Sequence, residues 1–371
     1  MDASSRIAAG DLRRHHLGLV LGEVVHGSAI SRAGIAAATG LTRSTVSGLT
    51  AELLAGGLVR DIGAGPGATS GRPGRRLVPD PAGPVGIALQ VEQDGVGGCL
   101  VDLAGRAGAR RWHRTGIAGS PPQRAARALA PVLRELLLAA AGGDRPAAGI
   151  VLAVPGVVAG PWPAATAAVS SPALGWDAVA IGAPVAAEAE RLGAGGIALE
   201  VRCAAALAAE AEPDAGPAGG TTVHVGGYSE IGVALVRDGR AGGRAATRFG
   251  HLTARPGGAA CPCGRRGCLV VETRPDVQPD PGRSGRLLGR ALAGFAAPID
   301  PDRVVLGGRF AAAGPAFAAA VTAELHRHGI PADRVAPATL GADAALRGAG
   351  RAALAPVIAD PWAWITGETT P

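Results

Sequence analysis

Three of the five cysteines lie within eight residues of one another, and a histidine precedes the first of them by ten residues. One imidazole and three thiolates form a closed tetrahedral ligand set for zinc, which leaves no position for a reactive water. Gly264 and Gly267 lie between the cysteines and would let the loop fold back so that all three sulfurs reach one ion. The sequence therefore predicts a structural zinc site, with a chance cluster of buried thiols as the alternative. Its four ligands would be His251, Cys261, Cys263 and Cys268.

Composition excludes some chemistry and indicates the cellular compartment. All 36 basic residues are arginine, so a mechanism that needs a catalytic or Schiff-base lysine is excluded. Cys99 and Cys203 are isolated in apolar surroundings, and the odd cysteine count fits a disulfide framework poorly, which favours a reducing cytoplasm. The charged N-terminus shows no secretory signal. Prolines interrupt the uncharged stretch 147–176, which we interpret as buried strand and loop rather than a membrane span.

The first eighty residues follow the pattern of a winged helix-turn-helix domain. Apolar residues recur at helical spacing from 12 to 25, and this predicts the first helix. Ser31 and Thr42 are N-cap residues for two further helices, which a turn containing Gly40 separates. Segments 58–62 and 75–79 read as the two strands of a β-wing, with the loop 63–74 between them.

This domain has the charge and side chains that DNA binding requires. Residues 1–80 contain nine arginines against six acidic residues, a net charge of +3. Short hydroxyl and basic side chains at the start of a recognition helix, with arginines on a wing, can meet phosphates and base edges. The alternative is a protein-docking helical trio with a solvated arginine loop. The predicted DNA contacts are Ser31, Arg32, Thr42, Arg43, Ser44, Thr45, Ser47, Arg72, Arg75 and Arg76.

The run Cys-Pro-Cys-Gly-Arg-Arg-Gly-Cys, preceded by Phe249-Gly250-His251, resembles the signature of the ROK family of repressors, open reading frames and sugar kinases. The N-terminal winged helix looks like that of the family's regulator branch. The resemblance implies an α/β fold with two actin-like, hexokinase-like lobes around a sugar and ATP cleft, and assembly as dimers or tetramers. The expected boundaries are a DNA-binding domain at 1–80 and a ROK domain at 81–371, with lobes at about 85–190 and 191–371 and a zinc loop at 251–268.

The residues that would transfer a phosphoryl group in this family are replaced. Its Asp-x-Gly-Gly phosphate loop has no counterpart at 89–94, and its second glycine-rich loop contains Tyr228 and Glu230. The Asp that acts as the family's general base corresponds to Arg202, which does not lose its proton in a protein. We therefore expect no enzymatic activity.

The sugar contacts of the family are also reduced. Arg248, Val270 and Ala173 stand where the resemblance would place a Glu, a second Glu and an Asn. The cleft would bind another effector, such as an anion held by arginines, or would bind nothing and act as a dimerisation scaffold. Ion pairs of these arginines with Glu200 or Glu230 are the alternative. The predicted effector-cleft residues are Glu200, Arg202 and Arg248.

These features predict a DNA-binding transcriptional regulator, most simply a repressor, that presents two winged helices to a palindromic operator. Its kinase-like domain would be catalytically inactive. An ATP-dependent sugar kinase with a DNA-binding appendage is the first alternative. A purely structural zinc protein with a vestigial winged helix is the second.

Overall fold

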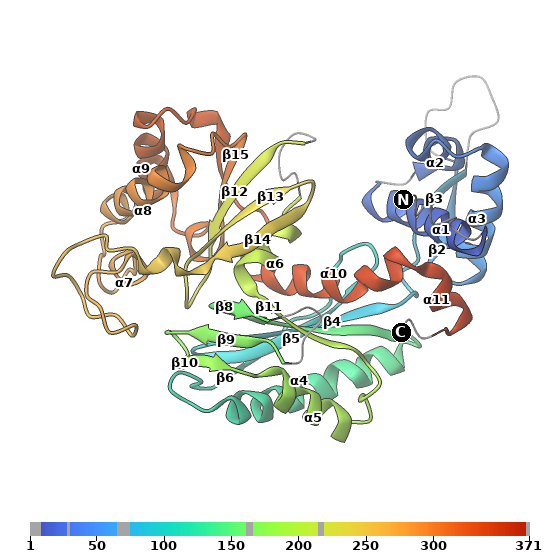
Figure 1. Ribbon diagram of the computed structural model, residues 1–371, viewed down its shortest axis with the longest axis horizontal. Helices are drawn as coiled ribbons and strands as arrows, with labels where there is room; N and C mark the ends of the chain where they lie inside the picture. Colours follow the sequence, from blue (N-terminus) through green and yellow to red (C-terminus); the bar gives the residue numbers. More distant parts are fainter. Residues whose placement is uncertain (1–8, 28–29, 65–74, 161–165, 214–218, 369–371) are drawn as a thin grey trace, which may run out of the picture.

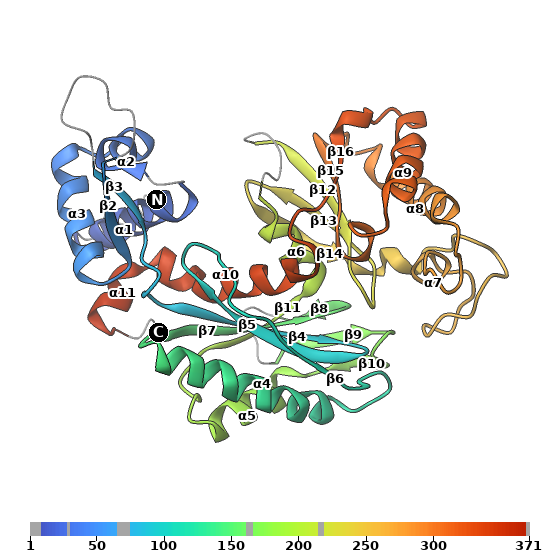
Figure 2. The same cartoon turned by 180° about the vertical axis from the view of Figure 1, so that it is seen from behind.

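The computed structural model describes residues 9–27, 30–64, 75–160, 166–213 and 219–368, which form a small N-terminal domain and two lobes, each built on its own sheet (Figures 1 and 2). Within this part of the chain, no helix has both the length and the apolar character needed to cross a membrane.

The N-terminal domain has the element order of a winged helix-turn-helix. Its helices are α1 (Ala9–His26), α2 (Arg32–Thr39) and α3 (Arg43–Ala55). Its sheet has the order β1 (Ile30–Ser31), β3 (Arg75–Pro79) and β2 (Val59–Ala64). Gly40 ends α2 in the left-handed conformation, with φ of 72°, as a helix C-cap commonly does. The predicted wing strands form within two residues of their expected bounds, whereas the first helix begins at Ala9, three residues before its expected start.

The first lobe surrounds a five-stranded sheet in the order β11-β7-β4-β5-β6. These strands are β4 (Val85–Glu92), β5 (Gly95–Asp102), β6 (Arg111–Arg114), β7 (Ala147–Val154) and β11 (Leu199–Cys203). One sheet face packs on α4 (Pro122–Gly142) and α5 (Gly182–Arg191), and the other on α6 (Ala204–Ala211) and α10 (Ala344–Ala359). A small sheet of β8 (Val157–Ala159), β9 (Ala168–Ser171) and β10 (Trp176–Val179) flanks this lobe.

The second lobe surrounds a sheet in the order β14-β13-β12-β15-β16. The strands are β12 (Thr221–Gly226), β13 (Gly232–Arg237), β14 (Arg240–Ala246), β15 (Arg303–Leu306) and β16 (Val335–Pro337). Its helices are α7 (Leu269–Glu272), α8 (Pro281–Ala296) and α9 (Pro315–Arg327).

The division between the lobes differs from the boundary expected at residue 190. Strand β11 pairs in parallel with β7 of the first sheet, and α10 returns from the second lobe to pack on β4 and β7. The first lobe is therefore discontinuous in sequence, because its last helix follows the whole second lobe. Linear spacing cannot reveal such a return.

The C-terminal helices join the N-terminal domain to the first lobe. Leu354 and Val357 of α10 belong to the same buried cluster as Leu17, Leu21 and Leu53 of the winged helix. The short helix α11 (Pro361–Thr366) adds partly buried tryptophans to this cluster. Figures 1 and 2 both show α10 running from between the lobes to a position beneath the winged helix.

Candidate nucleic-acid interface and metal centre

Helix α3 presents its first turn to solvent. Arg43, Ser44 and Ser47 are exposed there, while Val46 and Leu49 are buried beneath them. This division follows from helical periodicity, since residues three and four apart share a face. Among the described residues, Arg43 has no ion-pair partner. The turn predicted to read DNA is therefore free of neighbouring chain.

Several hydroxyl groups predicted to contact DNA are engaged in helix capping. The Thr42 hydroxyl accepts a hydrogen bond from the backbone N–H of Thr45 at 3.2 Å and lies 2.9 Å from the Ser44 hydroxyl. The Ser31 hydroxyl accepts from the backbone N–H of Gly34 at 3.1 Å. Because the first N–H groups of a helix have no partner within it, these oxygens fix where α2 and α3 begin.

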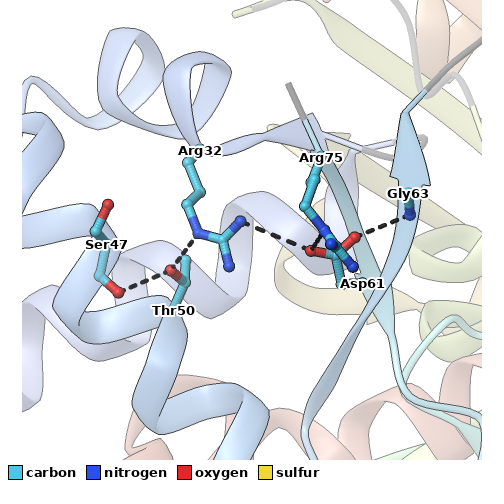
Figure 3. A network of polar contacts seen from close by, with 6 residues as sticks. All are labelled: Arg32, Ser47, Thr50, Asp61, Gly63 and Arg75. Atoms are coloured by element: carbon cyan, nitrogen blue, oxygen red, sulfur yellow. Dashed lines mark hydrogen bonds and ion pairs between the residues drawn. The ribbon is translucent and has the colours of Figure 1, made fainter. Parts of the chain in front are cut away.

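A polar network centred on Asp61 joins the helices to the wing (Figure 3). The Nε of Arg75 on β3 donates to Asp61 Oδ2 at 2.7 Å, and the backbone N–H of Gly63 donates to Oδ1 at 2.8 Å. Arg32 at the start of α2 donates from Nε to the Thr50 hydroxyl of α3 at 3.0 Å, and its Nη1 lies 3.8 Å from Asp61 Oδ2. One carboxylate on β2 thus holds α2, α3 and β3 in fixed relative positions.

The arginines of this network differ in how much of each side chain is exposed to solvent. The Arg75 side chain is 68% exposed, so its outer edge remains available, whereas Arg32 is 32% exposed and lies between helix and wing. Arg76 is half-buried, and its Nε has no hydrogen-bond partner in the described part of the chain. Arg72 lies outside the described residues. Asp61 could not be identified from local sequence patterns, because its arginine partners are distant along the chain.

The network keeps Asp61 ionised. Burial raises the pKa of its carboxyl group, but the Gly63 hydrogen bond and the guanidinium groups of Arg75 and Arg32 outweigh this effect. The pKa of Asp61 therefore lies below its ordinary value.

The four residues predicted to bind zinc lie together in the second lobe. Their ligand atoms all lie within 4.8 Å of one another. Cys263 Sγ is 3.6 Å from Cys268 Sγ, and His251 Nδ1 is 3.5 Å from Cys261 Sγ. Tetrahedral zinc with Zn–S near 2.3 Å and Zn–N near 2.0 Å requires S–S and S–N separations of roughly 3.6–3.8 Å. The cluster therefore has the dimensions of a metal site and could hold one ion.

The loop around the cluster depends on close backbone packing. Gly267 has a φ of 73°, and a Cβ there would lie 1.6 Å from the carbonyl oxygen of Arg255, so only glycine fits. The buried Glu272 carboxylate accepts from the backbone N–H of Ala259 at 2.6 Å and lies 3.0 Å from Arg255 Nε. Glu272 thus ties the loop to α7.

The three thiols of the cluster differ, because burial raises the pKa of Cys261 to about 12 and also raises the pKa of Cys268. Burial raises the pKa of Cys263, but hydrogen bonds from the backbone and side chain of Arg265 lower it more, to about 6. The thiolate is the form that binds metal. His251 Nε2 lies 2.9 Å from Oε2 of the buried Glu230, which raises the pKa of His251. A carboxylate on the far ring nitrogen orients a ligating histidine. Glu230 thus positions His251, a role that the sequence did not indicate.

A pocket of about 320 Å³ lies between the lobes beside this cluster. Gln93 and Ala173 line it from the first lobe, and Tyr228, His251 and Arg309 from the second. The residues that line this cavity are therefore different from the three that the sequence predicted for the cleft.

Of the three predicted effector-cleft residues, Glu200 and Arg202 lie beside each other, and none of the three lines this pocket. Arg202 Nη2 lies 2.7 Å from Glu210, and its Nε lies 3.4 Å from Glu200. Arg248 is exposed. Burial raises the pKa of Glu200 to about 7, which Arg202 only partly offsets. The alternative expectation, that Arg202 forms an ion pair with Glu200, therefore agrees with the structure. Glu210 is a further partner.

Hydrogen bonds join the lobes where the family's two phosphate loops would face each other. The backbone N–H of Ser229 donates to the buried Glu92 carboxylate at 3.2 Å, and the backbone N–H of Gln93 donates to the Ser229 hydroxyl at 3.1 Å. The backbone N–H of Ala173 donates to Glu230 Oε1 at 2.8 Å. These two segments are therefore held directly to each other at one side of the inter-lobe pocket, which Gln93 and Ser229 also line.

The ROK family model matches residues 89–273, about half of the chain, and the chain therefore contains a ROK family domain. In three dimensions the whole fold is similar to that of a ROK family transcriptional regulator, a homologue of the E. coli MLC protein, over 94% of this chain and 97% of that one, with a TM-score of 0.67 and 18% identity. A ROK hexokinase from Thermus thermophilus is 25% identical, with a TM-score of 0.54, over 74% of this chain and 99% of that one.

A kanosamine kinase from Amycolatopsis mediterranei (strain S699) is 32% identical over 29% of this chain and 46% of the enzyme. The match thus spans about half of that enzyme's length.

Asp61→Asn is expected to destabilise the winged helix by about 1–3 kcal/mol at pH 7, because it removes a shielded charged acceptor. Since the folded pKa lies below the unfolded value near 3.9, wild-type Asp61 stabilises the domain above that pH and loses its effect as pH falls through the folded pKa. The variant should lack this dependence. Hydrogen exchange of the backbone amides of α1, α2 and α3 at pH 7, 5 and 3.5 measures both effects in the domain itself. The control is Asp80→Asn in the same domain, and equal wild-type and Asp61→Asn stability at pH 7 would contradict the role.

Cys261→Ser should abolish binding of about one metal ion per chain and lower the melting temperature, because a structural metal contributes directly to folding. Elemental analysis by mass spectrometry, with differential scanning calorimetry, tests this expectation. Cys203→Ser, outside the cluster, is the matched control and should retain the metal. Full metal content in Cys261→Ser would rule out the assigned ligand set.

Proposed function

We propose that this protein is a DNA-binding transcriptional regulator, most simply a repressor, that acts as a homodimer or homotetramer on a palindromic operator. The observation that carries the proposal is the exposed first turn of α3 with Arg43, held beside the arginine-bearing wing by the Asp61 network. Winged helices insert such a turn into the major groove while the wing meets the backbone. Similarity of the fold to a ROK regulator supports the assignment.

The ROK domain, on this proposal, is not an enzyme. Arg202 at the expected general-base position stays protonated and is paired with Glu210 and Glu200. The backbone N–H groups of Ser229 and Gln93 are already engaged by Glu92 and by the Ser229 hydroxyl, so these two amides are not free to bind a phosphate. The pocket beside the metal centre remains available for a small-molecule effector.

Zinc is the metal that best fits the Cys₃His set, and its role is structural. All four positions of a tetrahedral ion would be supplied by His251, Cys261, Cys263 and Cys268. The ion would fix the loop against α7 beside the pocket. All five cysteines are free thiols, which supports placement in a reducing cytoplasm.

A sugar kinase with a DNA-binding appendage is the second candidate. The observations that favour it are the fold and sequence similarity to a ROK hexokinase and to part of a kanosamine kinase. The replaced catalytic residues oppose it.

Arg43→Ala should weaken binding to a DNA site selected from a random pool by about 5–100-fold, corresponding to roughly 1–3 kcal/mol. If Arg43 contacts phosphate, the slope of log K against log salt concentration should also become shallower by about one. Fluorescence anisotropy across a salt series measures both quantities. Arg127→Ala, on an exposed position of α4 in the first lobe, is the control and should bind as the wild type does. Unchanged affinity and an unchanged salt slope in Arg43→Ala would contradict the assignment of α3 as the recognition helix.

The purified protein should show no sugar-dependent ATP hydrolysis with glucose, mannose, N-acetylmannosamine or kanosamine. A coupled assay for ADP, run beside an active ROK glucokinase, tests this expectation. Hydrolysis that depends on one of these sugars would favour the kinase alternative.

A further inference from the structure

The positive charge of this chain is concentrated in one segment of the first lobe. Residues 110–134 contain six arginines and no acidic residue, so this segment accounts for the whole formal net charge of +6. The other 30 of the 36 arginines are equal in number to the 30 acidic residues. The segment includes the edge strand β6 and most of α4. A surplus confined to one surface produces a local positive potential there.

Helix α4 places three of these arginines in a row that faces solvent. Arg124, Arg127 and Arg134 are spaced by three and seven residues, so they share one face of the helix, and all three are exposed. The opposite face, which includes Leu129, is buried on the first sheet. Arg114, at the end of β6, is also exposed. We refer to these four arginines as the basic strip.

The basic strip lacks acidic partners. Two other arginines of the segment form ion pairs, Arg110 with Asp343 at 3.8 Å and Arg111 with Glu135 at 3.1 Å. In the described part of the chain, no carboxylate lies within ion-pair distance of an arginine of the strip. The protein itself therefore leaves four positive charges unbalanced on this surface.

Helix α8 carries a similar row that is balanced. Arg283, Arg286 and Arg290 are exposed at a spacing of three and four residues. Arg286 lies 3.9 Å from Asp280, and Arg290 lies 3.3 Å from Glu324. An arginine-rich composition therefore does not by itself produce an unpaired row.

Two side chains of the basic strip are already held in place. Arg124 Nε donates to the carbonyl oxygen of Gly116 at 3.2 Å, and Arg127 Nε donates to the carbonyl oxygen of Gln123 at 3.3 Å. Both bonds use Nε, so the Nη groups of these exposed side chains can donate to an external acceptor. Because binding normally has to order such long side chains, this arrangement lowers the entropy loss on binding.

The dimensions and composition of the basic strip fit a phosphate backbone. The row on α4 extends over about 15 Å at roughly 1.5 Å per residue, which is longer than a small anion. A protein interface or a lipid surface would require apolar anchors, and among the described residues of α4 Leu138 alone is a large exposed hydrophobic side chain. Backbone phosphates require positive charge without such anchors.

We propose that the basic strip binds the phosphate backbone of a second DNA duplex without reading its sequence. Helix α4 covers the face of the first sheet opposite to α10, and α10 packs against the winged helix (Figures 1 and 2). A duplex held by α3 would therefore not lie along the strip, and changes on α4 should leave its binding unaltered. One protein molecule would thus hold two duplexes. This additional function requires no recognition by α3.

Binding of a duplex of unrelated sequence by the full-length protein tests the basic strip by itself. In an Arg43→Ala background, which weakens α3, the further changes Arg124→Gln, Arg127→Gln and Arg134→Gln should lower the affinity by about tenfold or more. The slope of log K against log salt concentration should become shallower by about two to three, because each lost phosphate contact removes about 0.9. Fluorescence anisotropy across a salt series measures both quantities.

Two further variants in the same background separate a binding surface from a general effect of charge. Arg283→Gln, Arg286→Gln and Arg290→Gln on α8 remove the same charge and should leave affinity and slope nearly unchanged. Lysine at the three α4 positions (R124K, R127K and R134K) keeps the charge and should restore binding. An equal loss in both glutamine variants, no loss in the α4 variant, or no rescue by lysine would overturn the proposal.

A capture assay tests whether two duplexes are held at once. Wild-type protein on beads that carry a selected-site duplex should capture a labelled duplex of unrelated sequence. The α4 glutamine variant, with Arg43 intact, should bind the beads as the wild type does but fail to capture the second duplex. Capture by this variant would overturn the proposal. Wild-type binding to phosphatidylglycerol vesicles without capture of DNA would overturn the choice of a duplex in favour of a membrane surface.

Discussion

Helix α10 packs against two parts of the molecule at once, and the position of the N-terminal winged-helix domain depends on this double contact. Toward the first sheet, a Cβ on Gly86 of β4 would lie 2.2 Å from the carbonyl oxygen of Gly350. Toward the winged helix, a Cβ on Gly18 of α1 would lie 2.5 Å from the carbonyl oxygen of Ala359. Close-packed contacts of this kind leave little room for independent movement. A shift in the first lobe would therefore be carried to α1 rather than absorbed between the domains.

Glu230 has a comparable role at the other end of the molecule. Its Oε1 accepts from the backbone of Ala173 in the first lobe, and its Oε2 lies beside His251 in the metal cluster. The cluster, the inter-lobe pocket and the contact between the lobes therefore share one buried carboxylate. An occupied metal site would orient His251, and through it Glu230, so a structural ion could influence how the lobes meet without any part in chemistry.

Local sequence signals identified elements whose causes are themselves local. The caps Ser31 and Thr42, the glycine turn and the Cys₃His spacing all act over a few residues, so periodicity and spacing were sufficient to find them. Asp61 and Glu230 could not be found this way, because their partners come from distant segments that only the tertiary fold brings together. The return of α10 to the first sheet was missed for the same reason. Arg202 was only partly predictable. Its correspondence to the family's general base was apparent from the sequence, whereas its ion pair with Glu210 was not.

The arginines of this chain differ in which groups balance their positive charge. A guanidinium cannot become neutral, so each one that leaves water needs acceptors from the protein or from a ligand. Arg202 obtains two acids from its own lobe, and Arg32 and Arg75 share Asp61, so the protein itself accounts for their positions. Arg43 has no carboxylate partner among the described residues and lies on an exposed helix turn. Water satisfies its donors there, so the charge of Arg43 remains available to an external anion, as the proposed contact with DNA requires.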